Sequence, residues 1–365
     1  MELLKKVLTE SPEKSRRELV NIYNSLLEIE RDEYLQRGFY ERKVTDFKDY
    51  RNGYKARSLN TCFGKLELSK PQTRAGFESK FFDRYQRSEQ SIITACAEMY
   101  LNGVSTRKVS KLGENVFGAT VSPATISNYT KVLDEAVNIW RNLPLCSYYK
   151  YLFVDATYLK VRENNRVVSK AVYIAIGITE EGKYIILGFT VLGEESEDNW
   201  KTFFNHLKNR GLRKIDLIIS DKNKGLVAAI NKSFLDTEWQ RCVFHFTKNF
   251  LEKVPPKKKT EFKDRIGLIF AQLTKEECRK EGNKQILYFE ANGYEEIADY
   301  LEEALEEIIV YKGFNEKHWK KIRTTNKLER LNEEVKRRTK IIRIFPNIES
   351  VTRCVGYLLR ETDEK

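Results

Sequence analysis

The sequence predicts an α/β protein with a mixed five-stranded sheet and a helical insertion, preceded by a mainly helical region. Three stretches indicate this class. Residues 151–192 hold apolar, β-branched segments separated by two tight turns, residues 196–244 alternate helical and strand-like segments, and residues 247–318 are mostly helical and highly charged. Periods of two and of 3.6 residues distinguish strands from helices in such patterns.

The composition is globular and basic. The 365 residues include 65 Lys and Arg against 53 Asp and Glu, which gives a net charge of +12. That excess favours a polyanionic partner, most simply nucleic acid. A globular protein that happens to be basic is the alternative that charge alone leaves open.

Six cysteines are scattered along the chain, and the first residues, MELLKKVLTESPEK, lack the apolar core of a signal peptide. No apolar run approaches the roughly 18 residues that a membrane span needs. We therefore expect a reduced, cytoplasmic protein with no disulfide framework and no membrane partner.

The N-terminal arm, residues 1–50, is predicted to form one or two charged helices. Leucines and isoleucines recur there at helical spacing among charged residues. An ordinary amphipathic helix and an arm that dimerises or touches DNA both fit this pattern.

Residues 51–145 are predicted to bind DNA. A hairpin signal surrounds Phe63-Gly64-Lys65, and three helices follow, the last with Ser122 as N-cap and Pro123 at its first position. A short helix, SPATIS and a further helix fit a helix-turn-helix, although many three-helix clusters bind no DNA. The candidate DNA contacts are Arg107, Lys108, Ser122, Thr125 and Ser127.

The order of predicted strands and helices after residue 145 narrows the choice of fold. Tyr151–Arg162, Val167–Ile178 and Lys183–Leu192 form three antiparallel strands, with tight turns at Asn164-Asn165 and Glu181-Gly182. A helix at Ser196–Arg210, a strand at Ile215–Ser220, a helix at Leu226–Phe234 and a strand at Trp239–Phe244 complete the order. This is the order of a ribonuclease H-like sheet. We assign residues 146–246 and 319–365 to that domain and residues 247–318 to a helical insertion.

Asp155 stands among apolar residues in the first strand, where a carboxylate is unfavourable unless its charge is compensated. Either a structural ion pair or a bound metal ion would compensate the charge of Asp155. Asp221 follows the fourth strand, which lies beside the first in such a fold. Two carboxylates this close favour a cation between them, and Mg²⁺ prefers oxygen ligands. Glu329, in the final helical run, is the candidate for a third ligand of a two-metal site.

Seven segments together resemble the Mutator-type transposases of bacterial insertion sequences. They are VDATYLKVREN (154–164), SKAVYIAIGI (169–178), ESEDNWKTFFNHLKNRGL (195–212), SDKNKGLVAAI (220–230), WQRCVFHFTKN (239–249), RTTNKLERLNEEVKRRT (323–339) and FPN (345–347). STRKVSKL (105–112) and SPATIS (122–127) resemble the DNA-binding region of the same family. The resemblance implies a DDE transposase with Asp155, Asp221 and Glu329 as catalytic, metal-binding residues. Glu333 and Glu334 are rivals; spacing alone does not exclude Glu333, because i+4 lies on the same helical face, but the resemblance favours Glu329.

Cys242 and His245 also match a family signature, which implies a supporting role at the site or at nearby DNA. A lone C-x2-H pair is half a zinc site at best, so zinc is not expected. A packed cysteine and a surface histidine remain the alternative. The remaining basic candidates for DNA contact are Lys160, Arg162, Arg323, Arg330, Lys336, Arg337 and Arg338. Lys160 and Arg162 suit phosphate contact and local ion pairs equally.

The resemblance implies an enzyme that binds terminal inverted repeats and uses two Mg²⁺ or Mn²⁺ ions to cleave DNA and transfer the strand to target DNA. It also implies a homodimer or larger synaptic complex at the bacterial nucleoid. The alternatives are a transposase-derived DNA-binding regulator without catalysis and a ribonuclease H-like nuclease that does not join strands.

Overall fold

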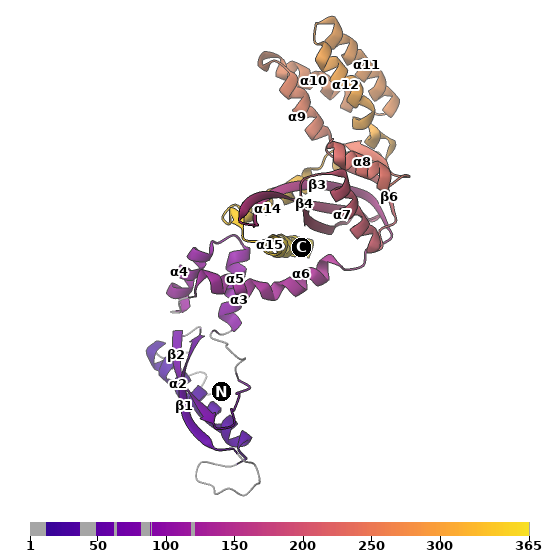
Figure 1. The fold of residues 1–365 in the computed structure, drawn as a ribbon. Helices are drawn as coiled ribbons and strands as arrows, with labels where there is room; N and C mark the ends of the chain where they lie inside the picture. The colour runs from indigo at the N-terminus through magenta and orange to yellow at the C-terminus, as the bar shows by residue number, and fades with distance from the viewer. Residues whose placement is uncertain are drawn as a thin grey trace. The chain divides into compact units, whose positions relative to one another are not determined.

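The computed structural model describes residues 12–36, 49–61, 64–81, 88, 90–117 and 121–364 (Figure 1). It divides into two compact units, Met1–Val132 and Leu133–Lys365. A mixed α/β architecture, as the sequence predicts, is confirmed. The expected hairpin tip at Phe63 and much of the N-terminal arm lie outside the described residues.

The first unit holds a helix on a hairpin and a separate group of helices. α2 (Pro12–Tyr34) packs its Leu27 against Leu59, Leu66 and Leu68 of the antiparallel strands β1 (Arg51–Thr61) and β2 (Gly64–Thr73). The helices that follow share a small apolar core; they are α3 (Gln90–Leu101), α4 (Thr106–Phe117), α5 (Pro123–Tyr129) and the short η1 (Thr130–Val132). Ser122 caps α5 through its hydroxyl, and Pro123 opens the helix, as predicted.

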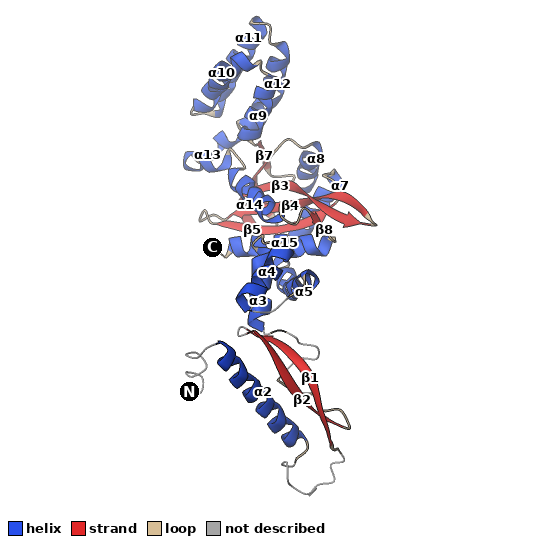
Figure 2. Cartoon of the chain, turned by 90° about the vertical axis from the view of Figure 1, so that its left-hand side faces the viewer, coloured by secondary structure: helices blue, strands red, loops and turns tan. Residues whose placement is uncertain are grey.

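The second unit is built on a sheet with the order β5-β4-β3-β6-β7 (Figure 2). Its strands are β3 (Tyr148–Glu163), β4 (Arg166–Ile178), β5 (Tyr184–Leu192), β6 (Lys214–Ser220) and β7 (Glu238–Arg241). The first three pair antiparallel, whereas β6 runs parallel to both β3 and β7. A two-residue strand, β8 (Ile344–Phe345), adds a sixth strand beside β3 that the sequence did not predict.

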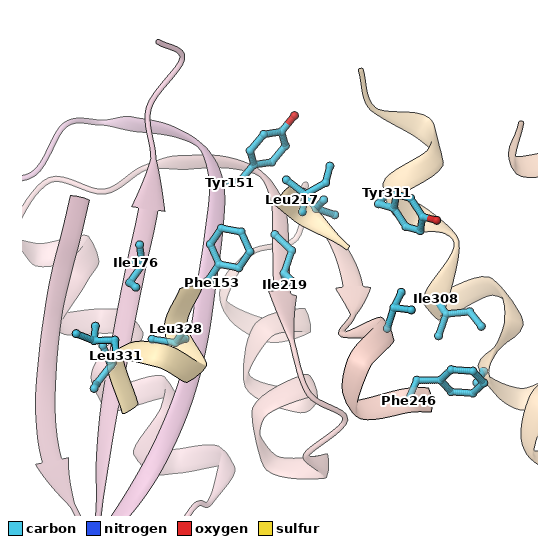
Figure 3. Packing of buried hydrophobic residues seen from close by; sticks show 14 of the residues in the cluster. Tyr151, Phe153, Ile176, Leu217, Ile219, Phe246, Ile308, Tyr311, Leu328 and Leu331 are labelled. Atoms are coloured by element: carbon cyan, nitrogen blue, oxygen red, sulfur yellow. The ribbon is translucent and has the colours of Figure 1, made fainter. Parts of the chain in front are cut away.

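Each face of the sheet is covered by helices because side chains alternate along the strands. Leu152 and Val154 of β3 point to one face, where α7 (Glu197–Asn209) and α8 (Lys224–Ser233) contribute Trp200 and Leu226 to the core. Tyr151 and Phe153 belong to the core of the opposite face, beneath α14 (Asn326–Thr339) and α15 (Ile348–Asp363). Figure 3 shows Leu328 and Leu331 of α14 near Phe153 and Ile176.

α6 (Leu133–Arg141) opens this unit and packs on α15, where Arg353 pairs with Asp134 at 2.6 Å. Between β7 and α14 the chain is helical, as the sequence predicts for residues 247–318. The helices are α9 (Val243–Lys253), η2 (Pro256–Lys258), α10 (Lys259–Ala271), α11 (Lys275–Ala291), α12 (Glu295–Ile308), η3 (Val310–Gly313) and α13 (Glu316–Ile322). Their aromatic core continues the larger core of the sheet through Phe246 and Phe250 of α9.

The strand predicted at Trp239–Phe244 is wrong in its second half. β7 ends at Arg241, Cys242 occupies the N-cap position, and α9 begins at Val243. Val243, Phe246 and Phe250 are buried and recur at helical spacing, so burial favours a helix although the local run VFHF is rich in strand-forming residues. His245 therefore lies in the first turn of a helix.

We expect Leu328→Ala to destabilise the second unit by about 2–5 kcal/mol, because a buried leucine leaves a cavity that the sheet and α14 cannot fill. Leu235→Ala is the matched control, since Leu235 is 85% exposed and its truncation should change stability by less than ~0.5 kcal/mol. Denaturant unfolding followed by tryptophan fluorescence measures both. Equal effects of the two substitutions would contradict the packing described for α14.

Candidate active site

Asp155 stands in β3, and Asp221 stands just past the end of the neighbouring parallel strand β6, at a matching level. Phe153 of β3 pairs with Ile219 of β6, and Asp155 and Asp221 each lie two residues further on. The period of two puts Asp155 on the face of Phe153, toward α14. The sequence prediction that these two carboxylates come together is supported by this register.

The electrostatics of the pair agree with that geometry. Burial, and then the charge of Asp221, raise the pKa of Asp155 to about 7. Burial also raises the pKa of Asp221, against the positive charges of His245 and Arg241, which lower it. Two close carboxylates are both ionised at neutral pH only at a cost, which a bound cation relieves.

α14 presents a polar face to this pair. Thr325, Glu329 and Asn332 follow one another at i, i+4 and i+7 and so share one side of the helix. The Asn332 amide Nδ2 donates a hydrogen bond of 2.8 Å to Asp155 Oδ2, and the backbone N–H of Ala156 donates one of 2.9 Å to Oδ1. Asn332 is only 5% exposed, and its Oδ1 has no hydrogen-bond partner among the described residues.

Glu329 is held at the start of the same helix. Its Oε1 accepts a hydrogen bond of 2.9 Å from the Thr325 hydroxyl and lies 3.6 Å from His245 Nε2. His245 in turn acts electrostatically on both Asp155 and Asp221. The carboxylate is 23% exposed, so it is reachable from solvent. The structure thus brings Glu329 to the same cluster of charges as the aspartate pair.

The neighbouring glutamates differ from Glu329. Glu334 forms ion pairs with Arg337 at 2.6 Å and Arg338 at 2.8 Å, and these bonds lower its pKa to about 2. Glu333 is exposed to solvent. Of the three, Glu329 is the carboxylate with a described contact to the charged cluster.

Cys242 and His245 adjoin Glu329 rather than standing alone. Although burial opposes it, the nearby His245 and hydrogen bonds from the Thr325 N–H and hydroxyl, at 3.4 and 3.3 Å from Sγ, lower the pKa of the Cys242 thiol. Cys242 in turn raises the pKa of His245 to about 9, with further contributions from Glu329 and Asp155. The lowered pKa of the thiol and the raised pKa of the imidazole each arise partly from the other group.

The same three side chains also form a possible set of metal ligands. One potential ligand atom each from Cys242, His245 and Glu329 lies within 4.8 Å of the others. The sequence offered only the C-x2-H half of this set, because Glu329 is distant along the chain. Sulfur and nitrogen donors favour a softer ion than Mg²⁺, so this set is chemically distinct from the aspartate pair.

Glu195 is a fourth carboxylate at this edge of the sheet, and sequence reasoning missed it. It precedes α7, and its backbone N–H donates to the Tyr158 hydroxyl at 3.2 Å. Burial and the charge of Asp221 raise its pKa, and its charge acts on Asp155 as well. Its position at the start of the segment ESEDNW, which belongs to the family resemblance, could have indicated Glu195. Asn332 was missed too, although its helical spacing from Glu329 could have indicated it.

The predicted DNA contacts in the first unit lie on α4 and α5. Arg107 and Lys108 are exposed on α4. Ser122 is exposed, but its hydroxyl accepts from the Thr125 N–H at 3.1 Å and shares a hydrogen bond of 2.8 Å with the Thr125 hydroxyl. Ser127 is partly buried. The two hydroxyls therefore already serve the helix cap.

The basic residues of the second unit divide into exposed and internal ones. Those exposed to solvent are Lys160, Arg162, Arg323, Arg330, Lys336 and Arg337. Arg338 differs because its side chain is 11% exposed and bonded to both Glu334 and Glu361. Arg338 is better suited to joining α14 to α15 than to contacting DNA. Lys160 and Arg162 lie an odd number of residues from Asp155 and so point to the other face of β3.

Comparison with known proteins decides the family. The model of the family described as Transposase, Mutator family matches residues 2–365. The chain belongs to the Mutator family of transposases. It is 42% identical to the transposase for insertion sequence element IS256 in transposon Tn4001 of Staphylococcus aureus, over 96% of this chain and 90% of that protein.

Other insertion-sequence transposases are similar along most of their length. The transposase for insertion sequence element ISRM5 of Rhizobium meliloti is 38% identical over 99% of this chain and 90% of its own. The transposase for IS1081 of Mycobacterium tuberculosis is 33% identical over 97% and 86%. A Drosophila P element transposase strand transfer complex aligns with a TM-score of 0.33 and 12% identity over 80% of each chain, a similarity too low to establish a shared fold.

Transposases of this family are DNA-cleaving and strand-transferring enzymes that generally use divalent metal ions, so the chain is an enzyme that acts on DNA. The expected enzyme class is thereby confirmed. In the part of the chain that the structure describes, no helix combines the length and apolarity that a bilayer span requires.

We expect His245 to titrate far above the other two histidines in the metal-free protein. Its pKa is raised to about 9, whereas burial lowers the pKa of both His206 and His318. A raised histidine pKa stabilises the fold below about pH 6.5, and that contribution is lost as pH rises toward 9. NMR titration of the imidazole protons measures all three. Cys242→Ala should bring the His245 pKa down, and an unchanged value would contradict the influence of Cys242 on His245.

Proposed function

We propose that this chain is a DDE transposase that binds the terminal inverted repeats of its insertion sequence, cleaves the element ends and joins them to target DNA. Asp155, Asp221 and Glu329 are its catalytic residues. The observation that carries the proposal is the register of β3 and β6, which sets both aspartates at the same level under the helix that holds Glu329. We also propose that the strand order corresponds to a ribonuclease H-like sheet, with its characteristic antiparallel and parallel pairs.

The residues at this site fit divalent cations of the Mg²⁺ type. The donors are carboxylate oxygens, which Mg²⁺ and Mn²⁺ prefer, and the mutual repulsion of Asp155 and Asp221 is relieved by positive charge. The unpartnered, buried Oδ1 of Asn332 adds an acceptor beside them. Two such ions, when bound, would activate the attacking oxygen and stabilise the leaving one.

The side chains of the protein would orient the DNA and hold the site together. Asn332 fixes Asp155, Thr325 fixes Glu329, and the positive His245 limits the repulsion among the acids. A water oxygen attacks the phosphorus at the element end, the P–O bond to the 3′ oxygen breaks, and a 3′-hydroxyl is freed. That hydroxyl then attacks a phosphodiester of the target and displaces its 3′ oxygen, so no covalent protein–DNA bond is needed.

DNA is proposed to contact both units. Exposed cations on or near α14, namely Arg323, Arg330, Lys336 and Arg337, suit backbone phosphates.

Residues 51–145 are proposed as the DNA-binding region and residues 1–50 as an arm. Residues 146–246 and 319–365 are proposed as the catalytic domain, with residues 247–318 as its insertion. A homodimer or larger synaptic complex would hold paired ends, and the bacterial nucleoid is the proposed location.

Asp155→Asn, Asp221→Asn and Glu329→Gln should each lower end cleavage and strand transfer by at least ~10²-fold, because each removes a charge that stabilises the reacting phosphate group. Glu333→Gln is the matched control on the same helix and should remain close to the parent. Labelled terminal-repeat duplexes with Mg²⁺ measure cleavage, and precut 3′-hydroxyl ends measure joining. Activity in Asp155→Asn equal to the parent would reject the site, and cleavage without any joining would indicate a nuclease.

The substitution Asp155→Asn should also raise the free energy of unfolding. Because the folded pKa of Asp155, about 7, lies above its ordinary value of 3.8, this carboxyl lowers stability as pH rises from about 4 to 7, and the full penalty persists above pH 7. Without divalent ions, Asp155→Asn should therefore unfold at higher denaturant than the parent at pH 8, and the difference should shrink toward pH 5. A lower midpoint at pH 8 would contradict the repulsion between the aspartates.

A further inference from the structure

Asn332 joins the strand that carries one catalytic acid to the helix that carries another. Its Nδ2 donates to Asp155 Oδ2 at 2.8 Å, and it lies one helical turn beyond Glu329 on α14. The side chain is 5% exposed, so this hydrogen bond is shielded from competing water. Both oxygens of Asp155 are then engaged, since the Ala156 N–H donates to Oδ1.

We propose that Asn332 is a positioning residue of this enzyme: its amide holds the Asp155 carboxylate in the orientation that binds the cation and sets its distance from Glu329. The inference rests on the proposed function and deepens it. An aspartate carboxyl rotates over a broad range about its last torsion unless hydrogen bonds restrain it. Two donors, one on each oxygen, restrain that rotation, while each oxygen keeps a lone pair for a cation.

The chemistry of an amide suits this role better than that of a charged donor. A lysine or arginine at position 332 would neutralise Asp155 and so compete with the cation for it. A neutral amide holds the carboxylate and leaves its charge available. The unpartnered Oδ1 of Asn332 supports a site completed by a further hydrogen-bond donor, because a buried acceptor without a partner is unfavourable.

The hydrogen bond between Asn332 and Asp155 depends on how α14 packs on the sheet. Leu328, Leu331 and Val335 are buried in the core beside Asn332, which fixes the rotation of the helix about its axis. Glu329 and Asn332 therefore move together. Losing the amide bond releases Asp155 from this helix without removing the apolar contacts that hold α14 on the sheet.

The test uses the full chain with precut terminal-repeat DNA and follows Mn²⁺ binding by the EPR signal of free Mn²⁺. Asn332→Leu matches the side chain in size and removes both polar atoms, whereas Asn332→Ser keeps polarity but is too short to reach Asp155. Asn205→Leu, on the exposed side of α7, is the control for the substitution itself. Asp155→Asn serves as the reference for a lost ligand.

We expect both Asn332 variants to bind Mn²⁺ about 10–100-fold more weakly, the range found when partners of metal ligands are removed. Raising Mn²⁺ should partly rescue their cleavage, and DNA affinity without divalent ions should stay at the parental value. A purely structural role would instead lower the metal-free unfolding midpoint and leave Mn²⁺ affinity unchanged.

Two results separate this inference from the proposed function. Mn²⁺ affinity within about twofold of the parent in both Asn332 variants, alongside weakened binding in Asp155→Asn, would overturn the role of Asn332 alone. Undiminished Mn²⁺ binding in Asp155→Asn would overturn the proposed metal site itself. If Asn332→Leu fails to fold, by circular dichroism, Asn332→Ser gives the same comparison against its own metal-free state.

Discussion

Repulsion between Asp155 on β3 and Asp221, just past the end of the adjacent parallel strand β6, is the constraint on which the rest of this site depends. Asp155 and Asp221 occupy matching positions because β3 and β6 share a register, so the sheet holds them together whether or not their charges favour it. Burial raises the pKa of both carboxyls, and the charge of Asp221 raises that of Asp155 further. His245, the Asn332 amide and a bound cation all act on this one repulsion.

α14 couples stability to chemistry. Its apolar side, with Leu328 and Leu331, fills the larger core, and its polar side carries Glu329 and Asn332. The helix can neither rotate nor slide without uncovering leucines, because leucine burial is worth several times a single surface hydrogen bond. Hydrophobic packing thus sets where the third carboxylate lies, and packing changes on this helix should alter catalysis at a distance.

Much of the second unit was predictable from the sequence because strands and turns leave periodic, local signals. The segment around Asp155 and the turn at Asn164-Asn165 are examples, and both asparagines adopt the positive φ that a tight hairpin turn requires. The strand expected at Trp239–Phe244 failed where local propensity and tertiary burial disagree: Val243 and Phe244 favour strands, but burial of Phe246 and Phe250 requires a helix.

Contacts between distant segments were less predictable. The spacing of Cys242 and His245 predicted that these two side chains lie together. Their proximity to Glu329 depends on how α9 packs against α14, which no local pattern encodes. Asn332 and Glu195 were overlooked for the same reason. Asp155 was singled out because a carboxylate among apolar residues is unusual in a strand, whereas the choice of Glu329 came from the family resemblance.

Anomalous diffraction from crystals of the protein with terminal-repeat DNA and Mn²⁺ tests the central claim most directly. The account predicts manganese peaks within coordination distance of Asp155, Asp221 and Glu329, with Asn332 still bonded to Asp155. A single peak held by Cys242, His245 and Glu329, with none between the aspartates, would contradict it.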